Sequence, residues 1–132
     1  MRQDTLIERD LVHDVVAVFY GVYNELGFGF LESVYRQSMR AAFEDAGLPA
    51  RCEVPLEVVF RGRVVGSFKA DFVVANRLVV ELKAAKALDP SHEAQLLNYL
   101  RATTLEVGIL LNFGHQPKFR RLVFSNSRKS SR

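Results

Sequence analysis

Two carboxylates and a lysine within residues 68–84 are the side chains whose types and spacing could do chemistry. Asp71 lies near the end of one apolar segment, and Glu81 and Lys83 lie two residues apart on the next. A charged group beside an apolar core stays charged only when it has a partner. A divalent cation is such a partner for two carboxylates, so the pattern indicates a metal site.

The distance between the two carboxylates depends on the register of the hairpin that these segments predict. If the hairpin is symmetric about Asn76, Asp71 lies opposite Glu81, with Cβ atoms about 4.5–5.5 Å apart. A two-residue turn at Asn76 and Arg77 would instead pair Asp71 with Leu82 and put the acids on opposite faces. A third interpretation is that both acids are solvated on an open sheet face.

Length and composition restrict the class of protein. A chain of 132 residues with 48% apolar and 25% charged residues predicts one soluble globular domain. The single cysteine, Cys52, excludes an internal disulfide framework and is typical of a reducing compartment. No Cys/His spacing indicates zinc. The start of the sequence carries acids, and no apolar run reaches the ~20 residues of a membrane span. We expect a cytoplasmic protein with no membrane partner.

Basic charge is concentrated near the end of the sequence. Acidic residues are absent after His115, whereas six basic residues follow it: Lys118, Arg120, Arg121, Arg128, Lys129 and Arg132. Such a segment favours contact with phosphates. Lys118, Arg120 and Arg121 are therefore candidate nucleic-acid contacts, with ordinary solvated residues as the alternative. Residues 125–132 predict a basic, disordered tail, which leaves residues 1–124 as the domain.

Hydrophobic periodicity predicts three helices. The first spans about 5–26, with Asp4 or Thr5 as its cap, and the second about 31–46. Asp89 followed by Pro90 is a strong helix start, and this third helix runs to about residue 102.

Alternating and short apolar segments predict five strands. They span about 53–60, 64–74, 78–83, 106–112 and 119–124. Pro55 indicates an edge strand, and Arg61 with Gly62 indicates a tight turn. The resulting order, ααβββαββ, predicts an α/β sandwich around a mixed sheet.

Polar residues on the helices could complete the site. His92, Gln95 and Tyr99 share one face of the third helix, which begins soon after Lys83. Gln95 and Tyr99 could orient a phosphate or a water, although Tyr99 could equally be a core residue and His92 a surface residue at the helix start. Glu32 is either a third carboxylate for the metal or a residue that favours a helix N-terminus.

Several segments together resemble a known family. Residues 29–35 match the Gly-x-x-Glu-x-x-Tyr signature of the GxxExxY family of the PD-(D/E)XK nuclease superfamily. The resemblance extends over about residues 10–124 and includes Asp71 with Glu81-Leu82-Lys83 and the segments 92–100 and 109–113. Ala70 stands where the superfamily name has a proline.

The resemblance implies a restriction-endonuclease-like fold and a role for each site residue. Asp71 and Glu81 would bind Mg²⁺ or Mn²⁺, with Glu32 as an accessory ligand. Lys83 would position the attacking water and stabilise the charge that develops on the phosphate. Gln95 would orient substrate or water, with Tyr99 beside it.

We therefore expect a metal-dependent nuclease, with DNA as the expected partner. The alternatives are a catalytically inactive nucleic-acid-binding module and a module that docks a protein partner on the same fold. A homodimer would supply two sites for two strands, and a targeting partner would supply specificity. The residues distinguish neither DNA from RNA nor an internal site from an end.

Overall fold

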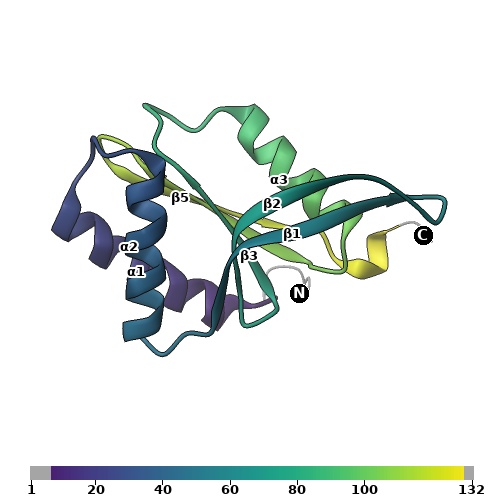
Figure 1. Ribbon diagram of the computed structural model, residues 1–132, viewed down its shortest axis with the longest axis horizontal. Coiled ribbons are helices and arrows are strands. Elements are labelled where there is room, and N and C mark those ends of the chain that lie inside the picture. Colours follow the sequence, from purple (N-terminus) through teal and green to yellow (C-terminus); the bar gives the residue numbers. More distant parts are fainter. Residues whose placement is uncertain (1–6, 130–132) are drawn as a thin grey trace.

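The computed structural model describes residues 7–129, and the order of its elements is the predicted one. The helices are α1 (Arg9–Leu26), α2 (Glu32–Asp45) and α3 (Pro90–Ala102), followed near the end by a 3₁₀ helix (Asn126–Arg128). The strands are β1 (Ala50–Phe60), β2 (Arg63–Val74), β3 (Leu78–Lys83), β4 (Val107–Phe113) and β5 (Pro117–Val123). Figure 1 shows this arrangement, which confirms the predicted α/β architecture.

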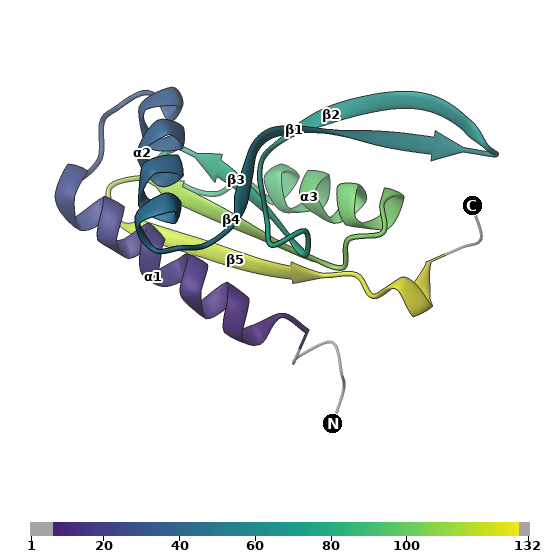
Figure 2. The ribbon, with the colours of Figure 1, turned by 60° about the horizontal axis from the view of Figure 1, so that its bottom comes forward.

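The five strands, all labelled in Figure 2, form one mixed sheet in the order β1-β2-β3-β4-β5. Only the β3–β4 pair is parallel within the described residues, and the other three pairs are antiparallel. A parallel pair needs a crossover, and α3 supplies it. Pro55 lies on β1, which is an edge strand as predicted.

Helices cover both faces of the sheet (Figure 2). On one face, α1 and α2 pack Phe19, Tyr35 and Phe43 against the sheet, and on the other α3 packs Leu96 and Leu100. Strand β3 shows the alternation that this layering requires. Leu78, Val80 and Leu82 belong to the α1/α2 core, and Val79 to the α3 core. Residues 81 and 83 therefore share the α3 face.

The ends of the elements confirm some predictions and correct others. The Asp89 side chain accepts a hydrogen bond from the Ser91 N–H at 2.8 Å, and Pro90 opens α3 as predicted. The predicted caps Asp4 and Thr5 lie outside the described residues. Residues 125–129, at the start of the predicted tail, make contacts with the domain: Ser125 is buried, and Lys129 Nζ donates to two carbonyl oxygens at 2.8 Å.

The distal half of the β1–β2 hairpin projects beyond the helical layers (Figure 2). Its tight turn has positive φ at Arg61 and Gly62, as two-residue hairpin turns require. Phe60, Val64 and Val65 are exposed near this tip. In the described part of the chain, no helix has the length and apolar character needed to cross a membrane.

Candidate active site

The β2–β3 hairpin places Asp71 and Glu81 together. Phe72 pairs with Val80 and Val74 with Leu78, so the hairpin is symmetric about Asn76 and the predicted register is confirmed. The ladder ends at the level of the two acids, where their side chains replace backbone pairing. Asp71 Oδ2 accepts the Leu82 N–H at 2.8 Å, and Glu81 Oε1 accepts the Asp71 N–H at 3.3 Å.

The two carboxylates interact unfavourably when both are ionised. The pKa of Glu81 is raised to about 8, mainly by burial and then by the negative charge of Asp71, although the hydrogen bond from the Asp71 N–H and the charge of Lys83 oppose the shift. Asp71 is itself buried. A cation between the two oxygens would offset their repulsion and favour the ionised form of Glu81. The pair thus fits a divalent metal that prefers oxygen ligands.

Arg36 on α2 is a residue of this site that the sequence analysis missed. Its Nε lies 2.9 Å from Asp71 Oδ1, and its Nη1 lies 3.8 Å from Glu53 Oε1. The hydrogen bond to Asp71 is the main cause of a raised pKa of Arg36. Glu53 interrupts the β1–β2 ladder with a φ of 54°, at the level of Asp71. The guanidinium therefore lies over acids from two neighbouring strands.

Glu32 lies one helical turn before Arg36, where its charge contributes to the raised pKa of Arg36. Residues 7–129 contain no group of three or more His, Cys, Asp or Glu side chains that could hold a metal ion. The structure therefore does not bring Glu32 together with Asp71 and Glu81 as a set of three ligands. The spacing of Glu32 and Arg36, at i and i+4 on one helix face, is the signal that could have identified Arg36.

Helix α3 contributes Gln95 and Tyr99. Desolvation raises the pKa of Tyr99, the charge of Glu81 raises it further, and a hydrogen bond with Gln95 lowers it. Both side chains are thus within reach of the site. The Tyr99 ring also stacks on Phe68, with centroids 3.4 Å apart. His92 has a different role, because its Nδ1 accepts the Asp89 N–H at 3.2 Å and completes the helix cap.

Two of the three predicted phosphate contacts lie on the same sheet face as the site. Across β3, β4 and β5, Lys83 is level with Asn112 and Lys118, and Glu81 is level with Leu110 and Arg120.

Arg120 and Arg121 project from opposite faces of β5. Arg120 Nε lies 3.6 Å from Glu93 Oε1 on α3. Arg121 instead donates a 2.5 Å hydrogen bond to the Ile7 carbonyl, before α1. The structure therefore separates Arg121 from Arg120, because consecutive strand residues alternate between faces.

Comparison with known proteins agrees with this geometry. The family model described as "PD-(D/E)XK nuclease superfamily" matches residues 9–122. Among solved structures, "Crystal structure of SSO0001" is similar with a TM-score of 0.56 and 19% identity, over 93% of this chain and 62% of that one. This likeness concerns the fold, and the chain spans less than two thirds of that structure. A comparison with curated proteins gave no match. By the match to its family model, the chain belongs to the PD-(D/E)XK nuclease superfamily.

Proposed function

We propose that this protein is a metal-dependent nuclease that hydrolyses phosphodiester bonds, with DNA as its expected substrate. The observation that carries the proposal is the Asp71–Glu81 pair, two adjacent carboxylates whose burial favours a shared cation. Superfamily membership supports the reaction class. The Gly29, Glu32 and Tyr35 spacing further supports membership of the GxxExxY subgroup.

In this mechanism Asp71 and Glu81 would hold Mg²⁺ or Mn²⁺ through their oxygens. Glu32, which the structure does not group with them as a third ligand, would act from α2 as an accessory carboxylate. The metal, when bound, supplies Lewis-acid chemistry that lowers the pKa of water and offsets charge on the phosphate. Lys83 places a fixed positive charge where negative charge develops on the phosphate oxygens. Gln95 orients the water or the substrate, and Tyr99 packs beside it.

The experiment is a cleavage assay on labelled single-stranded DNA, duplex DNA, branched DNA and RNA, with Mg²⁺, Mn²⁺ or EDTA. We expect the wild-type protein to cleave at least one substrate and EDTA to abolish cleavage. Asp71→Asn and Glu81→Gln should abolish it too, and Lys83→Ala should slow it about 10²–10³-fold. Glu57→Gln, at an exposed glutamate of β1, is the matched control. Wild-type rates in the Asp71 and Glu81 variants would refute the site.

A binding module without turnover is the second candidate, and the Arg36–Asp71 ion pair favours it, because a guanidinium already neutralises one of the two acids. This candidate predicts nucleic-acid binding that neither EDTA nor Glu81→Gln changes, and no cleavage in any metal. The same assay, combined with a binding measurement, therefore separates the two functions.

The setting of the activity is part of the proposal. The free Cys52 thiol supports a cytoplasmic location. A homodimer would present two sites to two strands, and a targeting partner would supply the specificity that a single small domain lacks. Sedimentation of the purified protein with and without duplex DNA tests the homodimer.

A further inference from the structure

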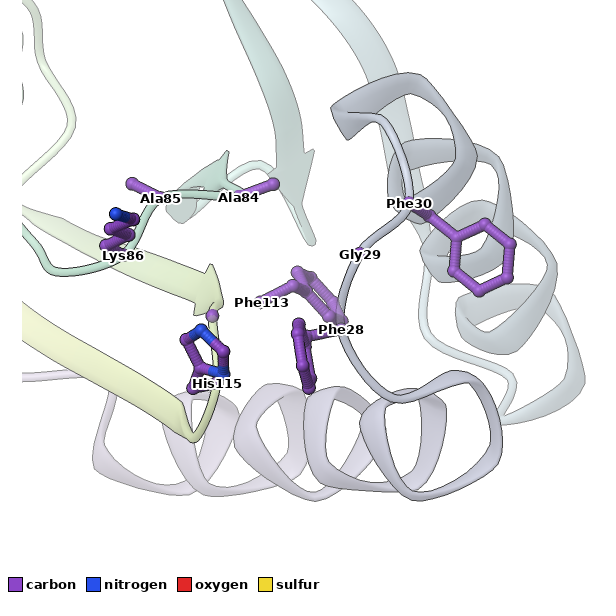
Figure 3. Close-up of a pocket in the computed structure, with 9 residues that line it drawn as sticks. Phe28, Gly29, Phe30, Ala84, Ala85, Lys86, Phe113 and His115 are labelled. Atoms are coloured by element: carbon purple, nitrogen blue, oxygen red, sulfur yellow. The ribbon is translucent and has the colours of Figure 1, made fainter.

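A small aromatic pocket lies directly beyond the candidate catalytic strand (Figure 3). Its volume is about 180 Å³. Three segments line it, namely residues 28–30 before α2, residues 84–86 after β3, and residues 113–115 at the β4–β5 turn. Because residue 84 follows Lys83, the pocket begins one residue beyond the proposed catalytic lysine.

Hydrogen bonds hold two of these segments against each other. The buried Asn112 side chain accepts the Ala85 N–H and donates to the Ala85 carbonyl, both at 3.0 Å. The Tyr23 hydroxyl lies 2.7 Å from the carbonyl oxygens of Gly114 and His115. The β4–β5 turn and the segment after β3 are therefore fixed before any ligand binds.

The Tyr35 side chain fixes the third segment. Its hydroxyl donates to the Gly27 carbonyl at 2.7 Å and accepts the Phe30 N–H at 3.3 Å. Its ring stacks on Phe113, with centroids 4.1 Å apart and an interplanar angle of 15°. Tyr35 thus joins the loop before α2 to the floor of the pocket. A wall held this firmly costs little entropy when a ligand binds.

The pocket presents aromatic faces and positive charge to solvent. Phe28 is 52% exposed, and its ring centroid lies 4.2 Å from that of His115 (Figure 3). Lys86 is exposed on the rim, and Lys83 precedes this segment. Aromatic platforms beside cations are the features with which proteins bind single-stranded nucleic acids, because bases stack on the rings while phosphates contact the cations.

We propose that this pocket holds the base of an unpaired nucleotide next to the phosphodiester that Asp71, Glu81 and Lys83 would cleave. The base stacks on Phe28 and His115, and Lys86 contacts its phosphate. The inference rests on the proposed nuclease function and names its substrate class, a single strand or an unpaired end. Bases inside a duplex are stacked on their neighbours and cannot enter a pocket without being extruded.

The test uses single-stranded oligonucleotides that carry 2-aminopurine at successive positions, in EDTA so that no cleavage occurs. Its fluorescence is quenched when the base stacks. We expect quenching at one position with wild-type protein, and none with the corresponding blunt duplex. Phe28→Ala should remove the quenching and weaken single-strand binding about tenfold, the effect expected when one aromatic ring no longer stacks on a base. Phe28→Trp should retain the quenching and the affinity for the single strand, whereas His115→Ala should weaken the quenching and the affinity.

Phe60→Ala is the matched control, because Phe60 is a similarly exposed aromatic residue at the tip of the β1–β2 hairpin, outside the residues that line the pocket. Unchanged quenching and affinity in Phe28→Ala would overturn the inference, as would equal quenching by the blunt duplex.

A parallel cleavage assay with Mg²⁺ and Mn²⁺ keeps the two proposals separate. Wild-type cleavage together with unaltered Phe28→Ala binding refutes the pocket and leaves the nuclease standing. Phe28-dependent quenching without cleavage of any substrate supports the base-binding pocket and refutes the nuclease.

Discussion

At the scale of single residues, Glu81 gives the site a dependence on pH. Its pKa is raised to about 8 in the folded protein, against an ordinary value of 4.5, chiefly by burial. The folded state therefore binds this proton more tightly than the unfolded state, and the contribution of Glu81 to stability falls as pH rises between these two values. Above pH 8 the wild-type protein carries the full cost of a buried carboxylate beside Asp71.

Glu81→Gln removes this cost, since an amide has no charge. In EDTA at pH 9 we expect the variant to be more stable than wild type by on the order of 2 kcal/mol, with little difference at pH 4.5. Denaturant unfolding at both pH values measures the free energies. An equal difference in the free energy of unfolding between Glu81→Gln and wild type at the two pH values would contradict the raised pKa. Glu57→Gln, at an exposed position, should show no difference from wild type at either pH.

Arg36 and a bound metal should substitute for one another as partners of Asp71. Arg36→Ala leaves the buried Asp71 carboxylate without its 2.9 Å ion pair, which should cost about 1–3 kcal/mol in EDTA. Saturating Mn²⁺ should recover most of this loss, because the cation neutralises the same carboxylate. Denaturant unfolding with and without Mn²⁺ measures the effect.

Arg40→Ala provides the control for this prediction, since Arg40 is an exposed arginine one turn later on the same helix. It should change stability little in either condition. A loss in Arg36→Ala that is equal with and without Mn²⁺ would show that Arg36 supports the fold and does not share the role of the metal.

At the scale of elements, the sequence predicts what local periodicity determines. The strand Leu78–Lys83 matches its predicted bounds, because its alternation reports the two faces of a sheet covered on both sides. The register about Asn76 follows from the same alternation and a three-residue loop. The start of β1 at Ala50 could not be predicted, since residues 50–53 alternate poorly and are held by pairing with β2.

Contacts between elements that are distant in the sequence could not be predicted, because hydrophobic periodicity carries no information about them. A helix arginine is usually solvated, and the pairing of Arg36 with Asp71 joins residues 35 positions apart. Likewise, the family signature contains Gly29 and Tyr35 but does not say how they interact. In the structure the Tyr35 hydroxyl bonds to Gly27 and Phe30, on either side of Gly29, and so holds this loop. The hydrogen bonds of residues 126–129 to residues 103–106 are likewise contacts that no local pattern reports.

The β4–β5 turn depends on a glycine for its close approach to the segment after β3. A Cβ atom at Gly114 would lie 2.6 Å from the Ala85 carbonyl oxygen, which is backbone and cannot move aside cheaply. We expect Gly114→Ala to lower the free energy of unfolding by about 1–3 kcal/mol. Gly66→Ala is the matched control on β2, where a Cβ atom meets nothing within 4 Å, and it should be neutral or slightly stabilising.

Thermal and denaturant unfolding of the two glycine variants measures this contrast. Equal stability of Gly114→Ala and Gly66→Ala would mean that the β4–β5 turn and the segment after β3 can move apart without a loss in the free energy of unfolding. In that case the pocket would not be preorganised by this close approach.

At the scale of the whole molecule, the sheet separates two environments. The α1/α2 side is a large apolar core, whereas the α3 side contains a smaller core and the charged ends of β3 and β5. Lys83, Lys118 and Arg120 lie on this second side, level with each other or with Glu81 across the sheet. The modest net charge of +3 therefore includes a local concentration of basic residues beside the candidate site.

This arrangement predicts how nucleic-acid binding depends on salt. Each neutralised phosphate releases counterions, so the slope of log K against log salt changes by about 0.7 for each phosphate of a single strand that the protein neutralises. The double variant Lys118→Ala, Arg120→Ala should reduce the slope by about that amount for each phosphate that it no longer neutralises. The ion pair of Arg120 with Glu93 is exposed and 3.6 Å long, so it is weak enough to yield to a phosphate.

Fluorescence anisotropy of a labelled single strand, titrated in EDTA at several salt concentrations, measures the slope. Arg9→Ala is the control, because Arg9 begins α1 on the opposite side of the sheet and is exposed. If Arg9→Ala flattens the slope and the β5 double variant does not, the strand runs over the α1 face and the site at Asp71 and Glu81 cannot be where it is cleaved. If only the β5 variant flattens it, the strand crosses the α3 face beside that site.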